Sequence, residues 1–380
     1  MNITLVINSL ASGGAERVLS GLANYWAAQG HQIHLITLAD SSKDHYPLVA
    51  GITRASLRAG EVSANPLHAL LLNWRRIRRL RKLLKQHRSD CVVAFLPTAN
   101  VVSLLASLGT GVPVIVAERN HPQFTQLPDS RRWLQRKTFP RAYRVVTLSK
   151  DIAAWCAEHY NCRTTVIPNG IELPLPEFEP RIDPDSVVSA EHKLIISVGR
   201  LEPHKQMDHV VQAFDDAMLE PDWHLVIIGK PGPGSQTYAA ELKNTSQQLA
   251  NGARITFLER VGNMQAWYER AAIFMFASRY EGFPNVLLEA MACGCATISY
   301  DFPGVAAEVI QDEENGLLIT DNNVDSLTAA LQQVARDQNL QQRLAQAAPG
   351  VLETFSLQAC QSRWTELVER AAGVDRPTIE

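Results

Sequence analysis

The stretch EGFPNVLLEAMACGCATI, residues Glu281–Ile298, combines a turn, a helix and a strand, and it contains two carboxylates in an otherwise apolar setting. Glu281 precedes a Gly-Phe-Pro turn, and Pro284 at the first helical position predicts a helix that begins near Asn285. Glu289 lies four residues beyond Asn285 and therefore faces the same side of that helix. A charge among Leu, Ala and Met is costly unless a partner binds it, so the two acids mark a candidate site.

Short apolar strands alternate with helical patterns along all 380 residues, and a chain of this length exceeds the size of one hydrophobic core. Continuous apolar strands between helices are typical of parallel sheets that are covered on both faces. We therefore predict an α/β fold with two Rossmann-like, doubly wound parallel-sheet domains that face each other across a cleft. The predicted strands are ITLVIN, IHLITL, CVVAFL, VPVIVAE, RVVTLS and TVIPN in the first half, and KLIISVG, WHLVIIG, ARITFL, AIFMFAS, ATISYD and GLLIT in the second.

The proline-rich segment IELPLPEFEPRIDPD separates the halves, because four prolines in fifteen residues disfavour a helix or a central strand. The predicted division is an N-terminal domain over 1–175, a linker over 176–192, a C-terminal domain over 193–355 and a last helix over 356–380 that crosses back to the N-terminal domain.

The distribution of charge suggests that the halves face different partners. Residues 1–175 carry 21 Lys and Arg against 10 Asp and Glu, whereas the remainder carries 15 against 29. Six irregularly spaced cysteines do not form a disulfide framework, which predicts a cytoplasmic protein. No apolar run approaches the about 18–20 residues that a membrane span requires.

Two further motifs follow predicted strands. In NSLASGGAERV, Gly14 stands at a strand-to-helix turn, where backbone amides can hold an anion; a tight turn without a ligand is the alternative. In ISVGRLEPHKQ, the strand ends at Gly199, and Arg200 and Lys205 share the next loop. Two cations there suit a diphosphate, although two solvated surface cations would have the same pattern.

Together these motifs predict a ligand with hydroxyl groups on both sides of a diphosphate, which is a nucleotide sugar. The amides at the start of the helix would bind the anion, while Glu281 and Glu289 would accept hydrogen bonds from hydroxyl groups. A buried salt bridge from Glu289 to an arginine remains open as an alternative.

The spacing Glu281-x7-Glu289, with GRLEPHKQ, NSLASGGAERV and NGLLI, resembles the retaining nucleotide-sugar glycosyltransferases of family 4, which have the GT-B fold. The resemblance covers essentially the whole chain. Within the family, the chain looks most similar to bacterial N-acetylgalactosaminyl and hexosyl transferases that build lipid-linked oligosaccharides and surface polysaccharides. One departure is Pro303-Gly304, where many relatives have a Ser-Gly-Pro run.

The resemblance implies a role for each matching residue. Arg200 and Lys205 would neutralise the donor diphosphate, Glu281 would face the donor sugar, and His121, in AERNHP, would lie near that sugar. These four are the candidate catalytic residues. The implied donor-binding residues are Gly14, Gly199, Val261, Phe283, Pro284, Asn285, Val286 and Glu289. The resemblance implies UDP as the nucleotide, no metal and no cofactor.

The segment LLLNWRRIRRLRKLLKQHR, residues 70–88, predicts a basic amphipathic helix with Leu70, Trp74, Ile77, Leu80 and Leu84 on its apolar side. Such helices lie on anionic bilayers, so we expect a peripheral protein on the inner face of the cytoplasmic membrane, with an acceptor on undecaprenyl diphosphate. The predicted membrane and acceptor residues are Arg75, Arg76, Arg78, Arg79, Arg81, Lys82 and Lys85. A core helix with a solvated face is the alternative; we expect no nucleic acid because no RNA-binding motif accompanies the basic patch.

Three other functions would share parts of this pattern. A GDP-mannose or lipopolysaccharide-core transferase would differ in donor and acceptor. A UDP-sugar epimerase would turn over its donor without an acceptor, and a non-catalytic binder would bind without turnover. The donor sugar, the linkage and the oligomeric state are not readable from the sequence.

Overall fold

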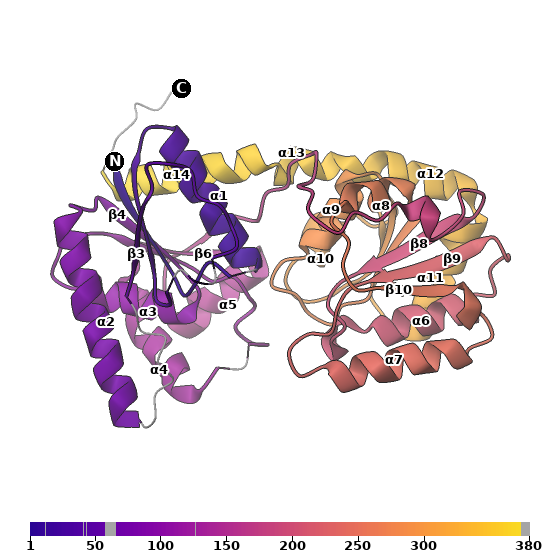
Figure 1. Ribbon diagram of the computed structural model, residues 1–380, viewed down its shortest axis with the longest axis horizontal. Helices are drawn as coiled ribbons and strands as arrows, with labels where there is room; N and C mark the ends of the chain where they lie inside the picture. Colours follow the sequence, from indigo (N-terminus) through magenta and orange to yellow (C-terminus); the bar gives the residue numbers. More distant parts are fainter. Residues whose placement is uncertain (12, 41, 43, 58–65, 126, 374–380) are drawn as a thin grey trace. The chain divides into compact units, whose positions relative to one another are not determined.

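The computed structural model describes residues 1–373 except 12, 41, 43, 58–65 and 126, and for residues 66–70 it describes the backbone alone. The chain divides into two compact units (Figure 1). The first comprises Met1–Asn169 and the C-terminal segment from Gln358, and the second comprises Gly170–Leu357. The division therefore falls six residues before the predicted boundary at 175, and the segment predicted as a linker belongs to the second unit.

The first unit is a seven-stranded parallel sheet with the order β3-β2-β1-β4-β5-β6-β7. Its strands are β1 (Asn2–Ile7), β2 (Gln32–Thr37), β3 (Thr53–Ser56), β4 (Cys91–Phe95), β5 (Val114–Ala117), β6 (Arg144–Thr147) and β7 (Thr164–Val166). Its helices are α1 (Gly14–Ala28), α2 (Pro66–Gln86), α3 (Pro97–Ser107), α4 (Asp129–Thr138), α5 (Lys150–Tyr160) and α14 (Leu357–Ala371).

The second unit is a six-stranded parallel sheet with the order β10-β9-β8-β11-β12-β13. Its strands are β8 (Lys193–Val198), β9 (Trp223–Ile228), β10 (Ile255–Leu258), β11 (Ile273–Phe276), β12 (Ala296–Tyr300) and β13 (Leu317–Ile319). Its helices are α6 (Met207–Asp216), α7 (Gln236–Gln248), α8 (Met264–Arg270), α9 (Asn285–Ala292), α10 (Ala306–Val309), α11 (Val324–Arg336), α12 (Gln338–Ala347) and α13 (Val351–Phe355).

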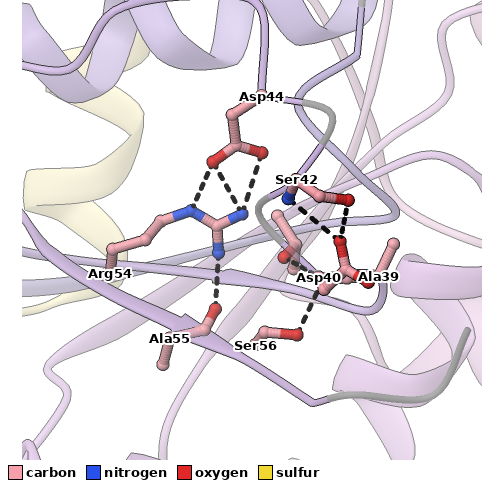
Figure 2. Close-up of polar contacts among 8 residues, drawn as sticks. Ala39, Asp40, Ser42, Asp44, Arg54, Ala55 and Ser56 are labelled. Carbon is pink, nitrogen blue, oxygen red and sulfur yellow. Dashed lines mark hydrogen bonds and ion pairs between the residues drawn. The ribbon is translucent and has the colours of Figure 1, made fainter.

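Both sheets confirm the predicted doubly wound parallel fold, and all twelve predicted strands are present. The sequence analysis missed β3, whose residues TRAS contain no apolar run. This strand lies at the edge of the first sheet, where Arg54 pairs with both carboxylate oxygens of Asp44 in the loop after β2 (Figure 2). Ser56 also donates to the Ala39 carbonyl at 2.8 Å, so polar contacts to this loop hold the edge strand in place.

The last helix completes the core of the first unit. Trp364 on α14 is fully buried, and its ring lies 5.5 Å from that of Phe95 on β4. Trp26 on α1 donates its indole N–H to Thr365 at 2.9 Å, which joins α1 to α14. The apolar side chains of α14 are therefore part of the same core as those of β1 and β4.

The segment predicted as a linker is bound along the second unit. Ile182 exchanges backbone hydrogen bonds with the Asn263 side chain at 2.9 and 3.0 Å and accepts another from the Trp267 indole at 2.9 Å. Arg270 also pairs with Asp185 at 2.7 Å. The prolines keep this segment extended, and its backbone polar groups find partners at the start of α8 and along it.

Candidate active site

The two motifs of the second half meet because β8 and β11 are neighbours in the sheet, although two other strands, β9 and β10, lie between them along the chain. The strand order reverses between them, and ligands of doubly wound sheets bind beyond the carboxyl ends of strands at this point. The loop after β8 carries Arg200 and Lys205, and the loop after β11 carries Glu281. The topology thus places both loops side by side at the carboxyl ends of these two central strands.

Lys205 and Glu281 are in direct contact. The Lys205 ammonium forms an ion pair with Glu281 Oε1, and the Ser278 hydroxyl donates to the same oxygen at 2.7 Å. Both side chains of the pair are only 12% exposed, so solvent screens their attraction weakly. The structure therefore brings together one cation and one acid of the predicted set, and it adds Ser278, which the sequence analysis did not single out.

Glycines at the ends of β8 and β9 leave room for the loop that carries Lys205. A side chain at Gly199 would lie 3.8 Å from Lys205 Cδ and 3.1 Å from Met207 Cε, so the lysine stem runs over this glycine. A side chain at Gly229, at the end of β9, would lie 1.8 Å from the Gly199 carbonyl oxygen. The backbone N–H of Arg279 also donates to the His204 carbonyl at 2.8 Å, which joins the two loops directly.

Arg200 lies in the same loop but has a different partner. Its guanidinium pairs with Glu202 Oε1 at 2.8 Å, and its side chain is 56% exposed while that of Glu202 is 11% exposed. His204 lies 3.5 Å from the other oxygen of Glu202 and stacks on Tyr280. Burial and then the Lys205 charge lower the pKa of His204 from its ordinary value. Glu202 was missed by the sequence analysis, although an acid inside a cationic loop was the available signal.

Glu289 lies on α9 and is half-buried. One of its oxygens accepts a hydrogen bond of 3.4 Å from the hydroxyl of Tyr268 on α8. Burial, and then the charge of Glu289, raise the pKa of Tyr268 well above its ordinary value, so this hydroxyl stays protonated as a donor. The contact gives the acid on the apolar helix a partner within the protein.

The turn before α9 differs in detail from the prediction. Pro284 is the N-cap residue and not the first helical residue, and it follows the buried Phe283. The amide of Asn285 bonds to the Phe283 carbonyl at 3.0 Å, and that of Leu287 bonds to the Pro284 carbonyl at 3.0 Å. Two of the three amides expected to face an anion are therefore used inside the turn, which leaves Val286 as the amide to which no described residue offers an acceptor.

Two further residues predicted to bind the donor are Val261 and Gly14. Val261 is 4% exposed, and Gly262 beside it pairs its backbone with Phe178 and Pro180 at 3.1 and 2.7 Å. In the NSLASGGAERV motif, α1 begins at Gly14, while Ser12 lies outside the described residues. A side chain at Gly13 would lie 2.3 Å from a Glu16 carboxylate oxygen, so Glu16 folds back over the start of α1.

His121 is buried in the first unit, with only 3% exposure. Its Nδ1 accepts the Gln123 backbone N–H at 3.2 Å, so Nε2 carries the proton and donates to Asp151 at 3.0 Å. The histidine also contacts the rings of Phe124 and Trp155. These contacts hold the loop after β5 in place.

Glu118, three residues before His121, is a buried acid that the sequence analysis did not single out. It is 3% exposed and accepts a hydrogen bond of 3.3 Å from Gln135, which in turn accepts one from Tyr160 at 3.1 Å. Burial raises the pKa of Glu118 to about 8. A hydrogen bond from the Arg119 backbone N–H and the positive charge of Arg119 offset this rise only in part. At neutral pH this carboxyl group is therefore mainly protonated.

The basic helix α2 is divided between structural and exposed cations. Leu80 and Leu84 are buried in the core, whereas Trp74, on the predicted apolar side, is 53% exposed; the side chain of Leu70 lies outside the described residues. Arg81 donates to the carbonyls of Leu105, Ala106 and Leu108 at 2.9–3.2 Å and thereby caps α3. The exposed cations of this helix are Arg75, Arg78, Arg79, Lys82 and Lys85.

Two kinds of site are absent from the described part of the chain. No group of three His, Cys, Asp or Glu side chains there lies close enough together to hold a metal ion. None of the described helices combines the length and the apolar composition needed to cross a membrane.

Two family models match this chain, one in each half. The family model described as "Glycosyltransferase Family 4" matches residues 12–174, and the one described as "Glycosyl transferases group 1" matches residues 179–351. The chain belongs to the glycosyltransferases of family 4. It is therefore an enzyme that transfers a sugar, and the candidate site lies in the part that the group 1 model matches.

Curated relatives and solved structures match over nearly the full length. An undecaprenol-linked glycan α-1,4-N-acetyl-D-galactosaminyltransferase of Campylobacter jejuni is 27% identical over 370 residues, which are 97% of this chain and 98% of that protein. A second transferase of that organism, a 4-α-N-acetylgalactosaminyltransferase, is 26% identical over 345 residues, which are 88% and 90% of the two chains.

Among solved structures, sucrose-phosphate synthase of Thermosynechococcus elongatus superposes with a TM-score of 0.82 at 19% identity, covering 99% of this chain and 100% of that one. Anabaena HepE in complex with UDP superposes with a TM-score of 0.80 at 20% identity, covering 97% and 100%. These similarities confirm the GT-B fold.

The Lys205–Glu281 pair should show a measurable coupling energy. In a double-mutant cycle of Lys205→Met and Glu281→Gln, followed by equilibrium unfolding in urea, we expect a coupling of about 1–3 kcal/mol because the pair is largely buried. The exposed pair Lys193–Asp222, with an N–O distance of 3.1 Å, is the matched control and should couple by less than about 0.5 kcal/mol. Equal coupling in both cycles would contradict the assignment.

Glu118 should make stability depend on pH. Its pKa is about 8 in the folded protein and near the ordinary 4.5 when unfolded, so the folded state binds more protons between these values. The contribution of Glu118 to the free energy of unfolding therefore falls as pH rises from about 5 to 8, and Glu118→Gln should remove this contribution. Urea midpoints measured across this range test it, with the exposed Glu158→Gln as a control that keeps the wild-type slope.

Proposed function

We propose that the protein is a retaining α-glycosyltransferase that moves a hexose or N-acetylhexosamine from a UDP-sugar to a glycan on polyprenyl diphosphate, in the synthesis of a bacterial surface glycan. The observation that carries the proposal is the Lys205–Glu281–Ser278 cluster beside Arg200, at the carboxyl ends of β8 and β11. The Campylobacter relatives, whose names describe undecaprenol-linked glycans, support the choice of acceptor. HepE, solved with UDP, supports the choice of nucleotide.

The cluster suits a sugar diphosphate because its charges are already arranged. Lys205 has three N–H donors, of which one contacts Glu281, so the others can reach diphosphate oxygens. Arg200 is exposed, and its planar guanidinium matches a phosphate group. Cations fixed in this way stabilise the charge that develops as the diphosphate leaves.

Glu281 is suited to hold the sugar. Its Oε1 already accepts from Lys205 and Ser278, whereas no described residue donates to Oε2. That oxygen can accept from a sugar hydroxyl group. A carboxylate neutralised by Lys205 is a weaker nucleophile, which supports a binding role over a covalent one.

The reaction then follows from the leaving group. The bond between the anomeric carbon and the phosphate oxygen breaks, and the acceptor hydroxyl oxygen forms its bond on the same face. The acceptor proton passes to the leaving phosphate oxygen, so the anomeric configuration is retained without an enzyme nucleophile. Arg200 and Lys205 supply the charge stabilisation, and for this reason we propose that no metal is needed.

A direct assay tests the function. The protein is incubated in EDTA with a panel of UDP- and GDP-sugars and with short-chain prenyl-diphosphate glycans, and the anomeric configuration of the product is read by proton NMR. We expect transfer from a UDP-sugar with an α-linkage. A β-linked product, dependence on added Mn²⁺, donor turnover without an acceptor, or donor binding with no transfer to any acceptor would each contradict the proposal.

Arg200→Ala should lower the transfer rate roughly 10²–10³-fold, by analogy with the loss of one oxyanion donor. Its stability should change little because the side chain is 56% exposed. Glu202→Gln weakens the same ion pair but leaves the cation, so it should keep most of the activity. Lys193→Ala removes an exposed cation at the opposite end of β8 and should have no effect. If Arg200→Ala and Glu202→Gln lost activity equally, the role of Arg200 would be to hold the loop.

A further inference from the structure

A cavity of about 320 Å³ in the first unit is lined by residues of α2, α3 and α4. This volume is within the range of about 300–1,000 Å³ that is usual for small-molecule sites. Most of its wall is apolar and comes from three helices. The apolar side chains of the wall are Leu72, Ile77, Val101, Val102, Leu105 and Leu134.

Two arginines share this cavity. Arg76 on α2 is half-buried and donates to Asn73 at 2.8 Å, and Arg131 on α4 is exposed. Both side chains line the cavity, and burial and then the like charge of Arg131 lower the pKa of Arg76, so the two cations repel each other. An anion between them would turn this repulsion into attraction, and guanidinium groups favour phosphate.

Large apolar side chains are exposed beside the cavity. Leu71 and Trp74 on α2 are 55% and 53% exposed, and Trp133 on α4 is 58% exposed. The Arg78 guanidinium stacks 4.5 Å from the centre of the Trp74 ring. Exposed Trp and Leu next to cations are typical of surfaces that lie at the boundary between headgroups and acyl chains.

We propose that this cavity binds the phosphate group and the first part of the hydrocarbon chain of a phosphate-headed lipid. Arg76 and Arg131 hold the phosphate, and the apolar wall between α2, α3 and α4 takes the chain. A prenyl diphosphate, which is the acceptor lipid and in this respect rests on the proposed function, is one source of this chemistry. A phospholipid of the bilayer is the other.

The cavity has a role different from that of the outer cations of α2. Arg75 and Arg79 are exposed on the helix surface and can attract any anionic bilayer through charge alone. Arg76 instead lines the cavity with Ile77 and Leu105, so this site favours a ligand with both a phosphate and a chain. Binding in the cavity should therefore depend on shape as well as on charge.

The experiment measures binding to the full chain by isothermal titration calorimetry, with saturating UDP present. The probes are farnesyl diphosphate, dihexanoyl phosphatidylglycerol below its micelle concentration, and inorganic diphosphate. Leu105→Trp fills the cavity and Arg131→Ala removes its exposed cation. Arg136→Ala removes an exposed cation of the same helix that does not line the cavity, and is the matched control.

We expect at least one of the two lipids to bind wild type at least tenfold more tightly than inorganic diphosphate. Leu105→Trp and Arg131→Ala should each weaken that binding at least tenfold, and Arg136→Ala should not. The lipid that binds identifies the source. Binding of neither lipid, equal binding of inorganic diphosphate, or lipid binding that Arg131→Ala leaves intact would overturn the proposal.

The outcome is separable from that of the proposed function. UDP binding, measured alone on each variant, reports the second unit, and a urea unfolding curve of each variant shows whether the first unit has folded. Lipid binding that depends on the cavity would stand even if no sugar were transferred. Sugar transfer that is unaffected by Leu105→Trp, together with absent lipid binding, would count against the cavity alone.

Discussion

The contact between Lys205 and Glu281 is the interaction on which the candidate site depends. Each residue follows a different strand, and the strands are neighbours only because the sheet order reverses between β8 and β11. Gly199 leaves room for the stem of Lys205, and Gly229 leaves room for the Gly199 carbonyl, since a side chain at either would meet these atoms. The site is therefore a product of topology and small residues as much as of the charged side chains themselves.

The pair also explains how a concentration of charge is tolerated near the core. Lys205, Glu281, Glu202 and His204 are all largely or half-buried, and each has a partner of opposite charge or a hydrogen bond. An isolated charge at any of these positions would be costly. Paired charges are instead held in a fixed arrangement before a ligand binds, which is the property that a site for a charged diphosphate needs.

The strand pattern and the motifs of the second half could be predicted because both are local. Apolar runs such as KLIISVG predict a buried strand wherever they occur, and the spacing Glu281-x7-Glu289 lies within one loop and helix. The edge strand β3 was missed because polar contacts to Asp44 and Ala39, and not apolar burial, hold it. Ser278 and Glu118 were missed for a related reason: their importance comes from partners brought near by the fold, which no spacing reveals.

The position of α14 has a consequence for how the protein is made. The first unit begins at the N-terminus, yet its core includes Trp364, which the ribosome adds only after the whole second unit. The second unit is continuous in the chain and can fold as soon as it has emerged, because domains generally fold as units during synthesis. Synthesis of the first unit therefore begins before that of the second unit and ends after it. Until α14 has been synthesised, the apolar side chains that it covers remain exposed to water or accessible to a chaperone.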